Sequence, residues 1–289
     1  MQATLQGRVC LVTGATSGMG KATAAALARQ GATVILVARD QRRGEQTRDE
    51  IRASSGNPRV ELLLADLSSQ AAIHGLVAAF KQRHRELHVL VNNAGGLFFE
   101  RQTTQEGLEM TFAVNHMAYF LLTNLLLDVL TASAPARIIN IASNAESAGR
   151  IDFDDLQHAR RRPFNSFNAY AQSKLANLLF TYELAGRLQG SGVTVNAVRP
   201  GPVATNFGAG GRGLFRLFPL IFRTIGQSAE QGAQTAIYLA SSPEVEGVTG
   251  KVFYHCKEVQ PSHQARDVAL QQRLWQASEE LIAAPVLNV

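Results

Sequence analysis

The stretch Arg8-Val9-Cys10-Leu11-Val12-Thr13-Gly14-Ala15-Thr16-Ser17-Gly18-Met19-Gly20-Lys21 decides the fold of this chain. Its residues up to Thr13 are mostly apolar or β-branched and predict a short buried strand. An alanine-rich helix follows the glycine-rich turn and is expected to run to about Gln30, with Gly31 just beyond its end. A second apolar run, Thr33–Ala38, predicts another buried strand, so these residues form one β-α-β unit.

The glycine-rich turn between the first strand and helix predicts a dinucleotide site. Glycines let the backbone approach a pyrophosphate, and a helix N-terminus offers amide groups and a positive dipole end. The spacing differs from the plain G-x-G-x-x-G pattern, but its place between a strand and a helix supports the prediction. The residues expected to contact the cofactor here are Gly14, Thr16, Ser17, Gly18, Met19 and Gly20.

Strand and helix patterns keep alternating along the rest of the chain. Further strands are expected at residues 60–65, 87–91, 136–142, 193–198 and 251–254, and helices at 71–85, 105–115, 116–130, 170–189, 228–239 and 264–282. This alternation predicts an α/β fold, with a Rossmann-type doubly wound parallel sheet of about seven strands and helices on both faces, in three α/β/α layers. Because no linker or repeat interrupts residues 1–289, we expect a single domain.

Composition excludes several classes of protein. The net charge of +5 is mildly basic, but the only tight cationic run is Arg160–Arg162, so no nucleic-acid partner is expected. Two cysteines, Cys10 and Cys256, imply no disulfide and favour a reducing compartment, so we expect a cytoplasmic protein without a metal. The first strand begins too early for a signal peptide, and no apolar run reaches the length of a membrane span.

The residues after the second strand bear on the choice of nucleotide. An acidic residue there accepts hydrogen bonds from ribose hydroxyls and favours NAD, whereas a guanidinium favours the 2′-phosphate of NADP. Arg39 and Asp40 follow Ala38. We expect NADP(H), bound through Arg39, with NAD(H) as the alternative in which Asp40 binds the ribose and Arg39 is solvated.

Later strand ends add candidate cofactor contacts. Asp66 is either a helix N-terminal residue or a partner for the adenine amino group, and both roles are compatible. The small residues after the fourth strand would let the backbone lie against a cofactor ring, and a proline turn after the sixth strand could dock a cofactor amide. The candidates at these strand ends are Asp66, Leu67, Asn93, Ala94, Gly95, Pro200, Gly201, Val203 and Thr205.

Tyr170 and Lys174 carry the predicted chemistry, together with Ser143. At i and i+4, the tyrosine and lysine share one helix face, one turn apart. A nearby cation favours the phenolate and would lower the tyrosine pKa toward neutrality, which suits a general acid and base. Ser143 follows the fifth strand, where open parallel sheets bind ligands. Asn115 lies among apolar residues and needs a polar partner, either a helix carbonyl or a water.

In this order, these motifs resemble the short-chain dehydrogenase/reductases over nearly the full length. Ser173-Lys174-Leu175-Ala176-Asn177 and the long segment before Tyr170 resemble the retinol dehydrogenase and WW-domain oxidoreductase branch. The resemblance implies that Tyr170 transfers the proton, that Lys174 lowers its pKa and binds the nicotinamide ribose, and that Ser143 hydrogen-bonds the substrate oxygen. It also implies that Asn115 holds a water linking Lys174 to solvent. The chain departs by having Ala142-Ser143 where Ser-Ser is common, and we expect no N-terminal membrane anchor of the kind that many of these relatives carry.

The expected function is NADP(H)-dependent interconversion of a carbonyl and an alcohol of a lipophilic small molecule, such as a retinoid, steroid or fatty compound. Residues 214–222 are unusually apolar and are expected to belong to a substrate lid at about 205–227, or else to a patch that contacts a membrane surface. The alternative function is a nucleotide sensor with little catalysis. A homodimer through the 115–130 and Tyr170 helices is the expected assembly, again from the resemblance.

Overall fold

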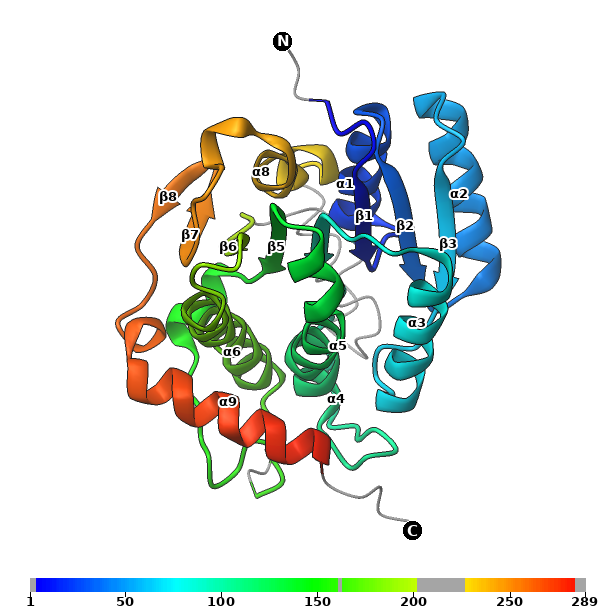
Figure 1. Ribbon diagram of the computed structural model, residues 1–289. Coiled ribbons are helices and arrows are strands. Elements are labelled where there is room, and N and C mark those ends of the chain that lie inside the picture. Colours follow the sequence, from blue (N-terminus) through cyan, green and yellow to red (C-terminus); the bar gives the residue numbers. More distant parts are fainter. Residues whose placement is uncertain (1–3, 161–162, 202–226, 284–289) are drawn as a thin grey trace.

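The computed structural model describes residues 4–160, 163–201 and 227–283 (Figure 1). Its centre is one sheet in the order β3-β2-β1-β4-β5-β6-β7-β8, parallel throughout except for the antiparallel pair β7 and β8. The strands are β1 (Val9–Thr13), β2 (Thr33–Ala38), β3 (Val60–Leu64), β4 (Val89–Asn92), β5 (Ala136–Ile141), β6 (Val193–Val198), β7 (Lys251–Tyr254) and β8 (Lys257–Val259). The doubly wound sheet is confirmed, with one strand more than predicted.

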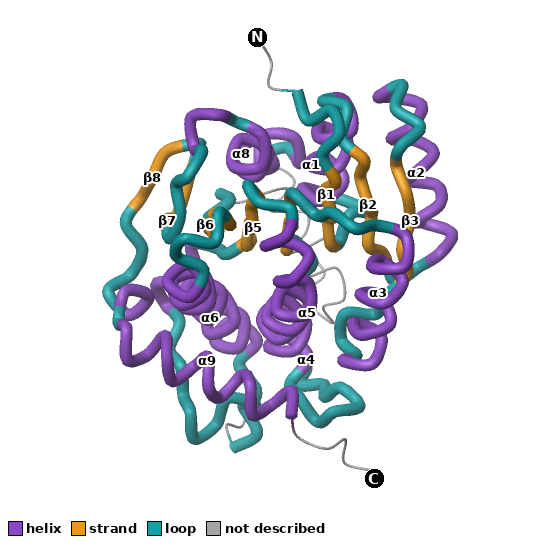
Figure 2. Tube along the Cα trace, in the orientation of Figure 1, coloured by secondary structure: helices purple, strands orange, loops and turns teal. Residues whose placement is uncertain are grey.

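Helices cover both faces of this sheet, as Figures 1 and 2 show. One face carries α1 (Gly18–Arg29), α2 (Gln41–Ser55) and α8 (Ala229–Ser241), and the other carries α3 (Gln70–Arg83), α5 (Ala118–Ala132) and α6 (Ser166–Arg187). The C-terminal helix α9 (Val268–Ala283) packs outside α6. Short helical segments are α4 (Met110–Phe112), η1 (Ala113–Met117), η2 (Asn144–Ala148), η4 (Pro243–Val245) and η5 (Gln264–Arg266).

Alternation along the strands divides the core between the two faces. In β1, Cys10 and Val12 join the cluster beneath α1 and α8, whereas Leu11 joins the cluster beneath α3 and α5. Strand side chains alternate between sheet faces, and both faces are covered, so a continuous apolar run is what the strand requires. This is why short apolar runs were sufficient to predict most strands.

Three elements differ from prediction. The α2 helix was not predicted because its sequence is almost wholly polar, with only Gly44, Thr47 and Ile51 buried. The helix expected from residue 105 begins only at Met110, because the backbone turns back through a bridge between Thr103 and Glu109. The β8 strand is only three residues long and follows a tight hairpin turn, so it has too little pattern to detect.

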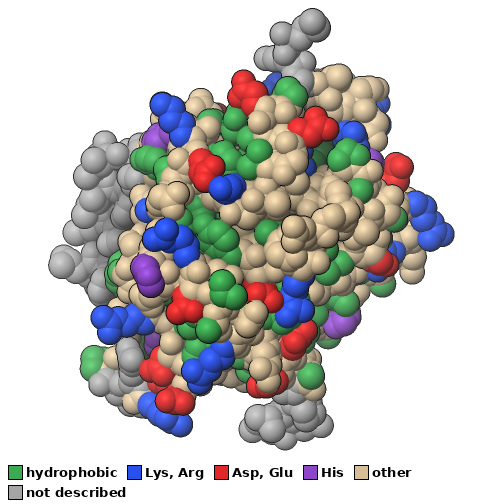
Figure 3. All heavy atoms as spheres, turned by 60° about the vertical axis from the view of Figure 1, so that its left-hand side comes forward, with side chains coloured by type: hydrophobic (Ala, Val, Ile, Leu, Met, Phe, Trp, Pro, Cys, Tyr) green, Lys and Arg blue, Asp and Glu red, His purple; other side chains and the backbone are tan. Residues whose placement is uncertain are grey.

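The surface and the long apolar helix bear on possible partners. On the face in Figure 3, basic and acidic side chains are intermixed rather than gathered in one basic stripe. Among the described residues, Met110–Ala132 is the one helix long and apolar enough to cross a membrane, but 67% of its most apolar window is buried inside the protein. A core helix passes the same test, so this segment is weak evidence for a membrane span.

Candidate active site

The candidate site lies at the carboxyl ends of the strands, where the sheet order reverses between β1 and β4. In doubly wound sheets, ligands bind at this switch point. The Thr13 hydroxyl ties the two strand ends together by accepting from the amides of Asn93 and Ala94, at 2.9 and 3.0 Å. Asn93 Nδ2 donates to the Thr13 carbonyl at 2.8 Å. The predicted glycine-rich turn and the Asn93–Gly95 segment therefore lie side by side.

The N-terminus of α1 has the features of a phosphate site. Its N-cap residue, Ser17, makes no side-chain capping hydrogen bond, so the first-turn amides depend on another partner. By contrast, four other long helices are capped by side chains, those of Asp40, Ser69, Asn165 and Ser228. Gly14 and Gly18 have φ of 64° and 53°, a left-handed backbone that favours glycine. These features fit a pyrophosphate, as the sequence predicted.

The two residues after β2 that could select the nucleotide, Arg39 and Asp40, have different surroundings in the structure. The Asp40 carboxylate accepts from the Arg43 amide at 2.8 Å and caps α2, so it already has a structural task. Arg39 is exposed, and within residues 4–160, 163–201 and 227–283 it forms no ion pair or hydrogen bond. The guanidinium is therefore available to an anion at this strand end.

The structure describes some of the remaining candidate cofactor contacts and leaves others outside the described residues. The N-cap of α3 is Ser69, so the prediction of Asp66 as a helix N-terminal residue is wrong; its Oδ1 instead accepts from the amide and hydroxyl of Ser68. Leu67 packs partly into the core beside it. Pro200 and Gly201 follow β6, where a methyl on Gly201 would lie 3.5 Å from the Tyr254 hydroxyl. Two candidates, Val203 and Thr205, and the 214–222 segment of the proposed lid lie outside the described residues.

Ser143, Tyr170 and Lys174 are brought together as predicted. Ser143 follows β5 and caps the η2 turn, with its Oγ accepting from the Ala145 amide at 3.2 Å. Its hydroxyl also interacts with the Tyr170 phenol on α6 and favours a lower pKa for that phenol. The Lys174 ammonium donates to the Ile141 carbonyl at 2.9 Å and lies 5.7 Å from the centroid of the Tyr170 ring. One strand end and one helix turn thus place a hydroxyl, a phenol and an amine in a single cluster.

Burial dominates the acid–base properties of this cluster. It raises the pKa of Tyr170 to about 12, against the opposing effect of the Ser143 hydrogen bond. It lowers the pKa of Lys174 to about 7. The expectation that the lysine cation brings the tyrosine pKa down is therefore not what the structure shows. Desolvation disfavours the charged form of each group, so it raises the pKa of the phenol and lowers the pKa of the amine.

Asn115 lies in a π-helical segment, η1, and is fully buried. Its Oδ1 accepts from the Gly96 amide at 2.8 Å, and its Nδ2 donates to the Gly96 carbonyl and to Ser173 Oγ, both at 3.0 Å. Both amide hydrogens have protein partners, so the side chain holds the Gly96 backbone in place, and the expected contact of Asn115 with a water stays a prediction. A methyl on Gly95 would lie 3.0 Å from Asn115 Oδ1 and 3.6 Å from Lys174 Nζ, so the glycine keeps space open beside the amine.

Two further residues lie in this cluster that were not predicted from the sequence. Asn177, one turn beyond Lys174 on α6, donates to the same Ile141 carbonyl at 3.3 Å. Tyr119 on α5 has its ring centroid 5.9 Å from Lys174 Nζ. The spacing from Lys174 to Asn177 was a usable signal, because i and i+3 share a helix face. Tyr119 gave no such signal, since its approach depends on packing between two helices.

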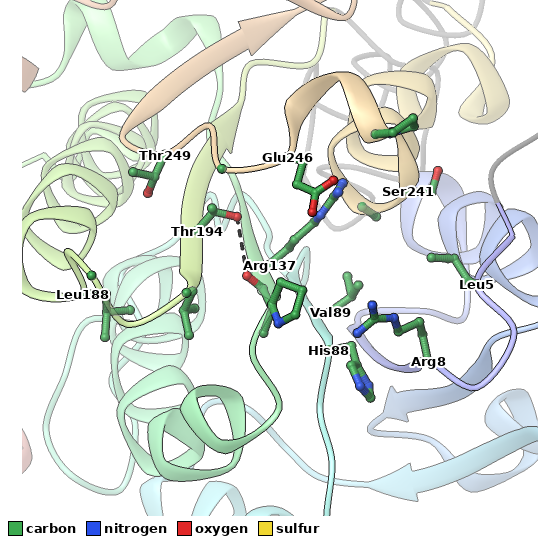
Figure 4. Close-up of a pocket in the computed structure, with 18 of the residues that line it drawn as sticks. Leu5, Arg8, His88, Val89, Arg137, Leu188, Thr194, Ser241, Glu246 and Thr249 are labelled. Atoms are coloured by element: carbon green, nitrogen blue, oxygen red, sulfur yellow. Dashed lines mark hydrogen bonds between the residues drawn. The ribbon is translucent and has the colours of Figure 1, made fainter.

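A separate cavity of about 660 Å³ opens at the opposite, amino end of the strands (Figure 4). Arg8, His88, Arg137 and Glu246 line it, and none of the predicted site residues does. Arg137 Nη1 donates to the carbonyls of Leu239 and Ser242, at 2.9 and 2.8 Å, and so closes the C-terminal end of α8. The Arg137 guanidinium thus has a structural role in the fold.

Comparisons with known proteins agree with this geometry. The family model described as short chain dehydrogenase matches residues 8–154 and 157–211. The chain belongs to the short-chain dehydrogenase family. Human retinol dehydrogenase 13 is 44% identical over 293 residues, which cover 100% of this chain and 88% of the relative. This places the chain in the retinol dehydrogenase branch, and it is an NAD(P)-dependent dehydrogenase acting on CH–OH groups.

Solved structures of the short-chain dehydrogenase family share the fold. An uncharacterised protein of Mycobacterium paratuberculosis is 32% identical with a TM-score of 0.79, over 99% of this chain and 97% of that one. An active-site complex of Pseudomonas aeruginosa RhlG with NADP is 29% identical with a TM-score of 0.67, over 86% and 95% of the two chains.

Proposed function

We propose that this dehydrogenase interconverts a lipophilic aldehyde or ketone and its alcohol with NADP(H), and that Tyr170 is the proton donor and acceptor. The observation that carries the proposal is the cluster of the Ser143 hydroxyl, the Tyr170 phenol and the Lys174 amine near the switch point of the sheet, with Lys174 Nζ 5.7 Å from the centroid of the Tyr170 ring. The cofactor supplies the hydride. The Tyr170 phenol gives its proton to the substrate oxygen during reduction, and Ser143 donates a hydrogen bond that stabilises the charge developing there.

The raised pKa of Tyr170 supports reduction at neutral pH. A phenol with a pKa of about 12 stays protonated there and is ready to donate. Alcohol oxidation needs the phenolate and becomes faster as the pH rises. The names of the relatives support a lipophilic substrate, since retinol dehydrogenases act on CH–OH groups of an apolar molecule.

Described residues of the chain suit several parts of the cofactor. The Gly14–Gly20 turn and the uncapped α1 amides suit the pyrophosphate, and Asp66 and Leu67, which follow β3, remain the candidates for contact with the adenine. Lys174 suits the nicotinamide ribose. Arg39 supports NADP over NAD, because its guanidinium is exposed while Asp40 is engaged by the Arg43 amide. The bound NADP of the Pseudomonas aeruginosa complex points the same way.

Replacing Arg39 tests the choice of cofactor. We expect Arg39→Ala to raise the KM for NADPH by about 10- to 100-fold, which corresponds to losing charge-assisted hydrogen bonds to a phosphate. The KM for NADH, which lacks the phosphate, should change little. Steady-state rates with both cofactors measure this, and Arg42→Ala, an exposed neighbour on α2, is the matched control. Equal losses with NADPH and NADH, or none with either, would refute the assignment.

A further inference from the structure

A buried carboxylate lies three residues beyond the candidate catalytic serine. Glu146 belongs to η2 and its side chain is 0% exposed. It pairs with Arg199, which follows β6, with Nη1 3.6 Å from Glu146 Oε1 and a side chain 18% exposed. Glu146 Oε1 also accepts from the Ser262 amide at 3.2 Å. The short turn that begins at Ser143 therefore carries a carboxylate that is buried and paired with an arginine.

Arg199 reaches further along the same segment, residues 143–149, which we call the serine turn. Its Nε donates to Asn144 Oδ1 at 3.0 Å, at the residue directly after Ser143. Its Nη1 also donates to the Gln260 carbonyl at 3.2 Å. One guanidinium thus binds the serine turn at two residues and anchors it to the segment before α9. The planar fork of arginine suits such a junction better than a lysine ammonium does.

The other side of the serine turn rests on α6. A methyl group on Gly149 would lie 2.5 Å from the carbonyl oxygen of Ala171, so the backbones are in direct contact there. Gln264 Nε2 donates to the Gly149 carbonyl at 3.2 Å. Ala171 follows Tyr170 in sequence. The serine turn therefore contacts the helix that carries Tyr170 at Gly149, and it binds Arg199 through Asn144 and Glu146.

We propose that Glu146 and Arg199 are a positioning pair that sets the location of the Ser143 hydroxyl relative to Tyr170. The proposal rests on the proposed function, because it assigns a task within that site. Arg199 directly precedes Pro200 and Gly201, so the same side chain links the serine turn to the segment expected to contact the cofactor. Buried ion pairs are weak sources of stability, since desolvation offsets their attraction. We therefore assign the pair a role in positioning the serine turn and the Pro200–Gly201 segment, rather than a role in stabilising the fold.

The test compares single and double variants in the full chain. Arg199→Met leaves a buried carboxylate unpaired and is expected to lower both stability and kcat. The double variant Arg199→Met/Glu146→Met removes both charges, so its thermal unfolding midpoint should recover toward that of the wild type. Its kcat should stay about 100-fold below wild type, a larger factor than any rise in the Kd for NADPH, because the serine hydroxyl is misplaced.

Two further variants keep the proposal testable if Arg199→Met does not fold. Glu146→Gln keeps the side-chain volume and is expected to lower kcat about tenfold, as one weakened buried contact would. Lys251→Met, which breaks the exposed Lys251–Glu258 pair at 2.9 Å, is the control and should retain kcat within about twofold. A double variant with both stability and kcat restored would overturn the proposal, and so would a loss confined to NADPH affinity.

Failure of the proposed function can be told apart from failure of this pair. If wild-type protein turns over no carbonyl substrate, the proposed function fails, but hydrogen exchange still reports on the serine turn. The amide of Ala145 donates to Ser143 Oγ and that of Glu146 to the Ser143 carbonyl, at 3.2 Å each. Faster exchange of these two amides in the double variant supports the positioning pair. Exchange equal to that of wild type overturns it.

Discussion

Tyr170→Phe should lower kcat for carbonyl reduction by about 100- to 10,000-fold, the range typical of removing a positioned general acid. The change deletes one hydroxyl and keeps the ring. Because Tyr170 lies within α6 and its ring is retained, the fold and the NADPH affinity should be nearly unchanged. The measurement is the decrease in NADPH absorbance with an aldehyde, together with NADPH binding by fluorescence titration.

Tyr182→Phe is the matched control for this prediction. Tyr182 lies on the same helix, is also partly buried and packs among apolar residues of the core on that face. Losing its hydroxyl should leave kcat within about twofold of wild type. Turnover by Tyr170→Phe at the rate of this control would remove Tyr170 from the mechanism.

Lys174→Met should make the protein more stable at neutral pH and remove part of the dependence of its folding stability on pH. Burial lowers the pKa of Lys174 to about 7 in the folded protein, against about 10.4 in an unfolded chain. Between these values the unfolded state binds one proton more, so wild-type stability rises with pH by up to about 1.4 kcal/mol per unit. The methionine variant lacks this contribution, so its advantage over wild type is greatest near pH 7 and shrinks toward pH 10.

Urea unfolding of both proteins at several pH values between 7 and 10 measures this difference. Burial also raises the pKa of Cys10 to about 12, and that contribution has the opposite sign above pH 9. It is common to both proteins and cancels in the difference. Parallel stability curves for wild type and Lys174→Met would show that the amine keeps an ordinary pKa. The variant should also lose most of its turnover, because the amine lies in the catalytic cluster.

Most of the fold could be predicted from local pattern. Strands such as Thr33–Ala38 and Lys251–Tyr254 were placed at their observed bounds, because covering both faces of the sheet requires continuous apolar runs. The α2 helix could not be, since its stability comes from an Asp40 cap and three small or apolar contacts within a polar sequence. The late start of α4 depends on Glu109, whose buried carboxylate accepts from the amides of Thr111 and Phe112, a local cap that hydrophobic periodicity does not reveal.

Those parts of the candidate site could be predicted that depend on the separation of residues along the sequence or on their place at the end of a strand. Tyr170 and Lys174 share a helix face by their separation, and Ser143 was suspect because it ends a strand. The direction of the tyrosine pKa shift was not predictable, because it depends on how much water α5 and α6 exclude from the cluster. The Glu146–Arg199 pair joins residues more than fifty positions apart, and only the fold reveals it.

The most direct test of the central claim is turnover by the wild-type protein across a panel of lipophilic aldehydes, ketones and secondary alcohols, with NADPH, NADH and their oxidised forms. The account predicts that at neutral pH NADPH is consumed with at least one carbonyl compound, with one alcohol formed per NADPH, and faster than with NADH. Tight NADPH binding with no turnover of any member would contradict it and favour a nucleotide sensor on the same fold.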